Sequence, residues 1–332
     1  MRYARHMQLR LPLALLLAFS SLTLAVVQFW PFVPPEREDR TAAALPSSAP
    51  ASLLPFLDDA LYASLGKPQP GEWLASHQED GQNVADFRKS SPNIPSRTRK
   101  VLYLLPLGKF PADGRTPSLD SLREYLSVYF QMEAKLAPAV TEAAPGAKRR
   151  INPGSGKPQL LSTDILKWLA GRLPSDAYCV LAVTMTDLFP EESWNFVFGQ
   201  ASLSRRVGVF SLARNDPAFS SMEDPGLDPG VTRSLLLRRA CITLSHETGH
   251  MFGWSHCCYY KCLMGGSNSL AESDRAPAGL CPVCLQKLHF SRPFDPVARQ
   301  KGLLVFYQKH GMEEDRKKAQ VILDAAGVGS GR

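Results

Sequence analysis

The sequence predicts an α/β fold in which helices pack against a mixed, twisted sheet. Short apolar runs rich in β-branched and aromatic residues alternate with amphipathic segments along the chain, and that alternation is typical of this class. The 332 residues are 44% hydrophobic and 21% charged, which excludes a disordered chain, a collagen and a multi-span membrane protein. The net charge is only +7, and three of the positive residues lie among the first ten, so we expect no nucleic-acid partner.

The strands and helices can be assigned in chain order from these patterns. Apolar runs predict strands at residues 101–105, 178–185, 194–201 and 206–212. Helical spacing predicts helices at 119–136, 162–173 and 231–251, the second beginning at capping residues, and a basic, Pro/Gly-rich surface loop at 142–157. Near the C-terminus, Asp295 and Pro296 begin a helix over 297–309, Gly311 ends it, and a charged helix continues to about residue 326.

The N-terminal segment differs from the rest of the chain. Residues 11–33 contain no charge and follow a basic stretch, which predicts a signal peptide or a membrane anchor. The alternatives are a buried helix, or an artefact that arises because the sequence was read from an upstream start codon. Because the positive side is N-terminal, the remainder would face the lumen or the exterior. We therefore expect a membrane-anchored or secretory protein, with the cytoplasm as the alternative that a thiol-rich chain favours.

The composition also predicts how the chain is divided. Pro, Ala and Ser dominate residues 34–56, which predicts a flexible linker. One folded domain is expected over 57–312, followed by a charged helix and tail over 313–332. We expect this chain to be a monomer.

The long helix ends in the sequence HETGHMFGWSH, residues 246–256, which fits the pattern H-E-x-x-H-x-x-G-x-x-H. His246 and His250 are one helical turn apart, so both imidazoles can bind one cation. Gly253 allows the chain to reverse, and His256 then supplies a third ligand. Three neutral imidazoles leave one zinc position for water, and Glu247 would accept a proton from that water. The alternative is two surface histidines on an ordinary helix.

Five of the seven cysteines fall between residues 257 and 284. Cys257 and Cys262 form one close pair, Cys281 and Cys284 form another, and 18 residues lie between the pairs. That spacing is typical of a structural zinc bound by four thiolates; the alternative is two disulfides. The remaining Cys258 is either a bystander or an alternate ligand. Because the third histidine and the first cysteine are neighbours, we expect the two zincs to lie close together, with the thiolate site fixing that histidine.

The two motifs together resemble those of the archaemetzincins, metzincin-like zinc peptidases with a second zinc bound by four cysteines. The resemblance covers residues 246–284, where CCYYKCLM directly follows the third histidine and CPVC closes the stretch. It implies a catalytic zinc at the three histidines, Glu247 as general base, a structural zinc at the four cysteines, and Met264 in a Met-turn beneath the histidine site. It also implies a metzincin-like α+β domain whose lower subdomain holds the four-cysteine site and the C-terminal helices, and in which strand 194–201 or 206–212 pairs with extended substrate.

We therefore expect a zinc-dependent metallopeptidase that binds two zinc ions per chain and hydrolyses a peptide or protein substrate. The resemblance adds aminopeptidase action on short peptides. The alternatives are a zinc-knuckle binding module with an idle histidine site and a disulfide-rich extracellular interaction protein. Glu247 argues against the binding module, because a non-catalytic site needs no general base.

Overall fold

The computed structural model describes residues 49–219 and 228–328 of the chain. The hydrophobic segment at 11–33 lies outside the described residues, as does most of the expected linker. Within the described residues, no helix is both long and apolar enough to cross a bilayer. Leu53 and Phe56, at the end of the expected linker, are buried, and the short helix η2 (Leu54–Phe56) packs against the C-terminal helix. The packed domain therefore begins before residue 57.

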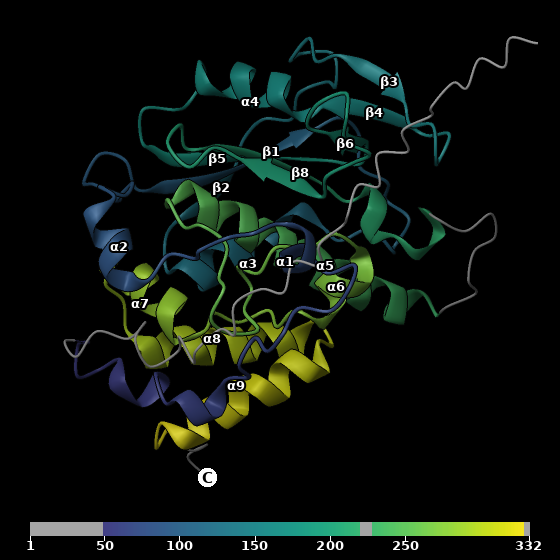
Figure 1. Ribbon diagram of the computed structural model, residues 1–332. Helices are drawn as coiled ribbons and strands as arrows, with labels where there is room; N and C mark the ends of the chain where they lie inside the picture. Colours follow the sequence, from purple (N-terminus) through teal and green to yellow (C-terminus); the bar gives the residue numbers. More distant parts are fainter. Residues whose placement is uncertain (1–48, 220–227, 329–332) are drawn as a thin grey trace, which may run out of the picture. The chain divides into compact units, whose positions relative to one another are not determined.

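A five-stranded mixed sheet forms the centre of the domain (Figure 1). Its strand order is β2 (Ala134–Leu136), β1 (Val101–Leu107), β5 (Ala177–Thr184), β8 (Val207–Ser211) and β7 (Gly199–Ala201). The first four strands are parallel, and β7 runs antiparallel to β8 at one edge. A second sheet has the order β3 (Arg149–Ile151), β4 (Pro158–Leu161) and β6 (Asp187–Phe189). The predicted α/β class is confirmed.

Helices cover both faces of the large sheet (Figure 1): α3 (Leu119–Phe130) and α5 (Pro229–Met251) on one face, and α4 (Ser162–Ala170) on the other. Strand β5 shows why its apolar run is continuous. Cys179 and Leu181 belong to the core under α3 and α5, whereas Val180 and Ala182 belong to the core under α4. Successive side chains point to opposite faces, so a strand between two helical layers needs apolar residues at every position.

Three helices lie on the far side of α5 from the sheet (Figure 1): α7 (Pro282–Ser291), α8 (Pro296–Lys309) and α9 (Glu313–Ala325). The other α-helices of the described residues are short: α1 (Trp73–Ser76), α2 (Val84–Lys89) and α6 (Leu270–Arg275). The predicted C-terminal pair is confirmed. The Asp295 side chain accepts hydrogen bonds from the first turn of α8, and Gly311, with a φ of 66°, separates α8 from α9. Helix α8 packs against both α3 and α9.

Two of the helix predictions are wrong at their ends. The helix expected to reach residue 136 stops at Phe130, because Gln131 adopts the left-handed conformation with a φ of 52°, and the residues after it form β2. The helix expected over 162–173 stops at Ala170, and Ser162 does not cap it. The Ser162 hydroxyl is buried and instead donates to the carbonyl oxygen of Phe189.

Two other predictions fail where a segment pairs locally. Residues 142–157, expected as a loop, contain β3, whose Arg150 pairs with Gln159 of β4. The strand expected over 194–201 is regular only from Gly199, because Val197 bridges to Leu188 of the second sheet instead. Short pairings of this kind carry little periodic signal in a single sequence.

Candidate metal centre

The three histidines of the motif converge in the structure. His246 and His250 project from the last turns of α5, which ends at Met251. Gly253 then adopts a φ of 89°, a conformation that favours glycine, and the chain turns back so that His256 faces the other two. One ring nitrogen from each histidine lies within 4.8 Å of the others, and the three ring centroids are 4.6–5.2 Å apart.

The hydrogen bonds at Nδ1 decide which nitrogen faces the centre. His246 Nδ1 donates to the carbonyl oxygen of Leu263 at 3.0 Å, and His250 Nδ1 donates to that of Trp254 at 2.7 Å. A carbonyl only accepts, so the proton of each neutral ring sits on Nδ1 and the Nε2 lone pair is free. His256 Nδ1 donates to a carboxylate, that of Glu79, at 2.9 Å.

This arrangement fits a cation. The Nε2 atoms of His246 and His250 are 3.0 Å apart, and two facing lone pairs at that separation repel one another unless a cation or a proton lies beside them. Protonation is disfavoured: burial, followed by the charges of the other two histidines, lowers the pKa of His246, and burial lowers the pKa of His250 to about 4. His246 and His250 therefore offer neutral imidazoles, the form that binds zinc.

Glu247 lies beside this centre on α5 and is 5% exposed. Within the described residues, no group hydrogen-bonds its carboxylate, and burial raises its pKa to about 8. A bound divalent cation would oppose that rise, because positive charge favours the carboxylate. Across from it, Gly199 of β7 approaches so closely that a Cβ there would lie 2.6 Å from Glu247 Oε1. The edge strand and the acid are therefore in contact.

The four paired cysteines also come together. Cys257, Cys262, Cys281 and Cys284 are buried, and their sulfurs lie within 4.8 Å of one another. All seven cysteines are free thiols, and the 3.6 Å between the sulfurs of Cys257 and Cys281 is far longer than a disulfide bond. The two-disulfide alternative is therefore not what the structure shows. Burial raises the pKa of the Cys281 thiol, and its thiol neighbours add to that rise, so four thiolates need a cation among them.

The remaining predicted residues have separate positions. Cys258 is outside the four-sulfur cluster, and its sulfur donates to the backbone carbonyl of His256. Met264 is fully buried, and its sulfur would lie 2.5 Å from a Cβ at Gly249. Because Gly249 precedes His250 on α5, Met264 lies directly against the helix that carries two of the histidines. Glycine at 249 is what lets the two segments approach so closely.

No pattern in the sequence points to Glu79 or to the aromatic residues around it. Trp73 stacks on His77 with ring centroids 3.7 Å apart, and Trp194 lies 6.5 Å from Trp73 and 6.3 Å from His77. The Trp73 ring is 5.3 Å from that of His256. His77, which has no metal-like spacing in the sequence, therefore lies within an aromatic group that borders the third histidine.

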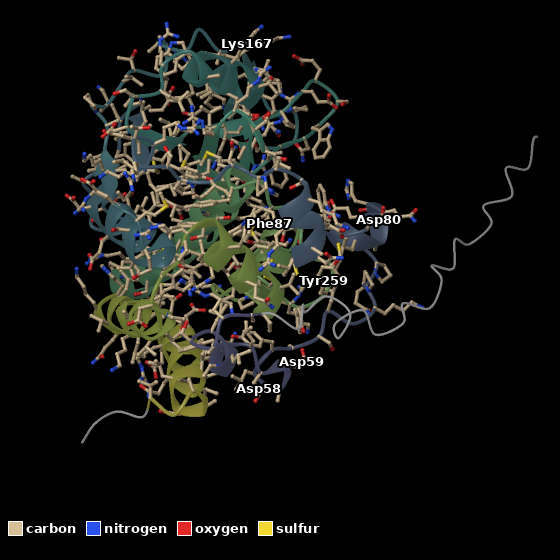
Figure 2. The ribbon with its side chains drawn as sticks, turned by 90° about the vertical axis from the view of Figure 1, so that its left-hand side faces the viewer. Asp58, Asp59, Asp80, Phe87, Lys167 and Tyr259 are labelled. Carbon is tan, nitrogen blue, oxygen red and sulfur yellow. The ribbon has the colours of Figure 1, made fainter. Side chains whose placement is uncertain are left out.

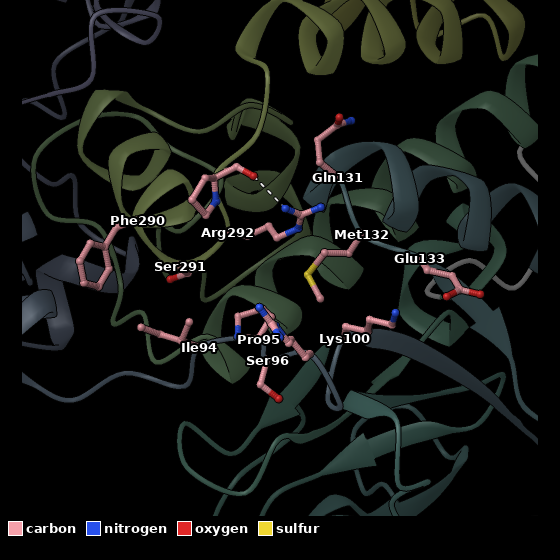
Figure 3. A pocket seen from close by; sticks show the side chains of 12 residues that line it. Ile94, Pro95, Ser96, Lys100, Gln131, Met132, Glu133, Phe290, Ser291 and Arg292 are labelled. Atoms are coloured by element: carbon pink, nitrogen blue, oxygen red, sulfur yellow. Dashed lines mark hydrogen bonds between the residues drawn. The ribbon is translucent and has the colours of Figure 1, made fainter.

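A pocket of about 570 Å³ lies elsewhere on the surface (Figure 3). Ile94 and Phe290 line one part of it, and Lys100, Gln131 and Arg292 line another. None of the histidines or cysteines described above contributes to it. The pocket is thus separate from both clusters.

Comparison with known proteins identifies the family. A family model described as Peptidase family M54 matches residues 175–290. Archaemetzincin-2 of Macaca fascicularis is 38% identical over a 271-residue alignment that covers 74% of this chain and 74% of that protein. The chain belongs to the archaemetzincin family. It is a zinc metallopeptidase, and the resemblance seen in its sequence is confirmed.

More distant archaemetzincins extend the comparison. Human archaemetzincin-1 is 30% identical over 259 residues, covering 71% of this chain and 52% of that protein. The archaemetzincin of Methanopyrus kandleri, whose crystal structure is known, is 31% identical in sequence and has a TM-score of 0.44. The match covers 59% of this chain and 97% of that one. The archaemetzincin of Archaeoglobus fulgidus, in a crystal structure with malonate, is 27% identical in sequence and has a TM-score of 0.42. The match covers 56% of this chain and 99% of that one.

Proposed function

We propose that this archaemetzincin holds two zinc ions and that peptide hydrolysis takes place at the first of them. His246, His250 and His256 would hold the catalytic zinc, and the four buried cysteines would hold a structural one. The main support is the convergence of three imidazoles beside a buried carboxylate that has no hydrogen-bond partner among the described residues. A zinc ion bound there supplies a Lewis acid that polarises a substrate carbonyl and activates water.

Glu247 is the proposed general base and acid. Its buried carboxylate would take a proton from the attacking water and deliver one to the nitrogen of the leaving amine. Since no described residue hydrogen-bonds this carboxylate, both of its oxygens remain available for that transfer. Its position next to His246 in the sequence would bring Glu247 beside the metal without making it a ligand.

The substrate is proposed to lie along β7. Strand β8 lies inside the sheet between β5 and β7, whereas β7 is at the edge. An extended peptide can add to an edge strand through main-chain hydrogen bonds. Gly199 of β7 contacts Glu247, so a peptide beside β7 would bring its backbone toward the catalytic acid.

The test is Glu247→Gln, assayed with a mixture of short peptides and by zinc analysis. The variant should lose about 10²–10⁴-fold in turnover and keep both zinc ions, because the amide has nearly the same shape and Glu247 is not a ligand. Unchanged turnover would place the peptidase centre elsewhere. A wild-type chain that binds both zinc ions but cleaves none of the peptides would favour a binding module with an idle histidine site.

Two further expectations remain predictions. Aminopeptidase action predicts that acetylating the N-terminus of a peptide abolishes its cleavage, whereas an endopeptidase would cut both forms. Membrane or secretory targeting through residues 11–33 predicts that deleting this segment releases the protein into the soluble fraction.

A further inference from the structure

A segment ahead of the sheet crosses the loop that carries His256, Cys257 and Cys262. We call residues 59–82 the strap and residues 253–268 the ligand loop. At one end of the strap, Tyr260 donates to the Asp59 carboxylate, and the backbone N–H of Lys261 donates to the carbonyl of Ala63 at 2.9 Å. Figure 2 shows Asp59 and Asp80, from the two ends of the strap, on either side of Tyr259.

The other end of the strap is fixed to the start of the ligand loop. The Gln82 side chain donates to the carbonyl of Gly253 at 3.2 Å and accepts from the N–H of Ser255 at 3.3 Å. In the middle, Trp73 fills the space over Gly266, where a Cβ would overlap the indole ring. The strap is therefore anchored to the ligand loop at both ends and at Trp73 in the middle.

Glu79 is the strap residue that reaches the metal centre. His256 Nδ1 lies 2.9 Å from Oε1 and 3.1 Å from Oε2 of Glu79. The indole N–H of Trp73 donates to Oε1 as well, at 2.9 Å. The two side chains of the pair are only 18% (His256) and 28% (Glu79) exposed, so water competes little for this contact. Trp73 thus orients a carboxylate that in turn orients an imidazole.

The other two histidines of the centre donate to backbone carbonyls, whereas His256 donates to a charged group. A hydrogen bond to a carboxylate is about twice as strong as one between neutral groups. It also makes the imidazole a better donor to a metal and fixes which nitrogen faces the ion. His256 is in most need of such support, because it lies in a loop after the helix has ended.

We propose that Glu79 is a positioning residue for the catalytic zinc. It holds the ring of His256 in the Nδ1–H form and directs Nε2 toward His246 and His250. Trp73 supports it, so the strap is a functional part of the metal centre. This inference rests on the proposed function, in which the three histidines bind zinc.

The experiment measures zinc affinity of the folded chain by competition with a chromogenic chelator. His256→Ala identifies the zinc that belongs to the histidine site. Glu79→Ala should lower the affinity for this zinc by about 10–100-fold. Glu79→Gln should lower this affinity by only about 3–10-fold. Its carbonyl oxygen can still accept from His256 Nδ1 and from the Trp73 indole N–H, but it carries no charge. The cysteine-bound zinc should not change in either variant.

The matched control is Glu72→Ala. Glu72 is another strap carboxylate and pairs with Arg275 at 3.0 Å, without reaching His256, so its loss should leave zinc affinity unchanged. Trp73→Phe keeps most of the ring but loses the N–H. It should lower the zinc affinity of the histidine site by less than Glu79→Ala does. Cobalt absorption at the histidine site should shift in the Glu79 variants and not in Glu72→Ala.

The two proposals fail in different ways. If Glu79→Ala and Glu79→Gln bind zinc like the wild type while His256→Ala loses it, the role of Glu79 is refuted and the zinc site stands. If His256→Ala also keeps all its zinc, the proposed metal centre itself is refuted. Should Glu79→Ala fail to fold by circular dichroism, the affinity of Glu79→Gln decides, and a wild-type value would reject the inference.

Discussion

Gly199→Ala tests whether the edge strand and Glu247, the proposed catalytic acid, are matched in shape. A Cβ at this position would lie 2.6 Å from Oε1 and 2.7 Å from Cγ of Glu247. The backbone of Gly199 does not have a positive φ, so alanine causes no backbone strain. The clash therefore falls on the Glu247 side chain.

The size of the effect follows from the overlap. Carbon atoms pack at about 3.5 Å or more, so a contact of 2.7 Å at Cγ requires Glu247 to move by about 0.8 Å. Misplacement of a reacting group by about 1 Å can cost about 10²-fold in rate. We expect turnover to fall by about 30–100-fold. The free energy of unfolding should change by less than about 1 kcal/mol, because the end of a flexible side chain can move and alanine restricts the unfolded chain.

The assay compares kcat for a cleaved peptide, zinc content and urea unfolding between the wild type and the variant. Gly279→Ala is the control, because it adds the same methyl group in the same domain with no atom within 4 Å. It should retain wild-type turnover. Wild-type kcat in Gly199→Ala would refute the reasoning, and so would a loss of activity that is explained by lost zinc.

Three further predictions concern the surroundings of the metal centre. Cys281→Ser should remove the second zinc and, since the thiolate cluster adjoins His256, weaken zinc at the histidines by about tenfold in a metal titration. Gly249→Ala would place a Cβ 2.5 Å from the Met264 sulfur. Overpacking destabilises a core by about 1–3 kcal/mol, and the higher helix propensity of alanine stabilises the helix by about 1 kcal/mol. The free energy of unfolding measured in urea should therefore fall by up to about 2 kcal/mol. Trp194→Ala, at a ring that is 39% exposed, should raise KM for peptides by about 5–10-fold with zinc affinity unchanged.

Each of these has an outcome that contradicts it. Unchanged affinity at the histidine site in Cys281→Ser would show that the two clusters are independent. A Gly249→Ala variant that is more stable than the wild type by about 1 kcal/mol would mean that Met264 repacks without cost. A drop in kcat rather than a rise in KM in Trp194→Ala would point to a role in the chemical step instead of substrate binding.

The sequence predicted the parts of the site whose spacing is local. His246 and His250 share a helix face because a helix repeats every 3.6 residues, and Gly253 supplies the reversal that brings in His256. The structure places all three together. The end of α3 was not predictable in the same way, because Gln131 takes a left-handed conformation that a sequence normally signals with glycine.

By itself, the sequence determined the α/β class, the family and the two groups of residues that are candidates to bind metal. These depend on composition and on short intervals along the chain, which are set by covalent geometry and helical repeat. Only the tertiary structure decided that Gly199 faces Glu247 and that Glu79 supports His256, a contact across 177 residues. Such pairings are selected by how strands, strap and ligand loop pack, and packing of distant segments leaves no fixed interval for a single sequence to show.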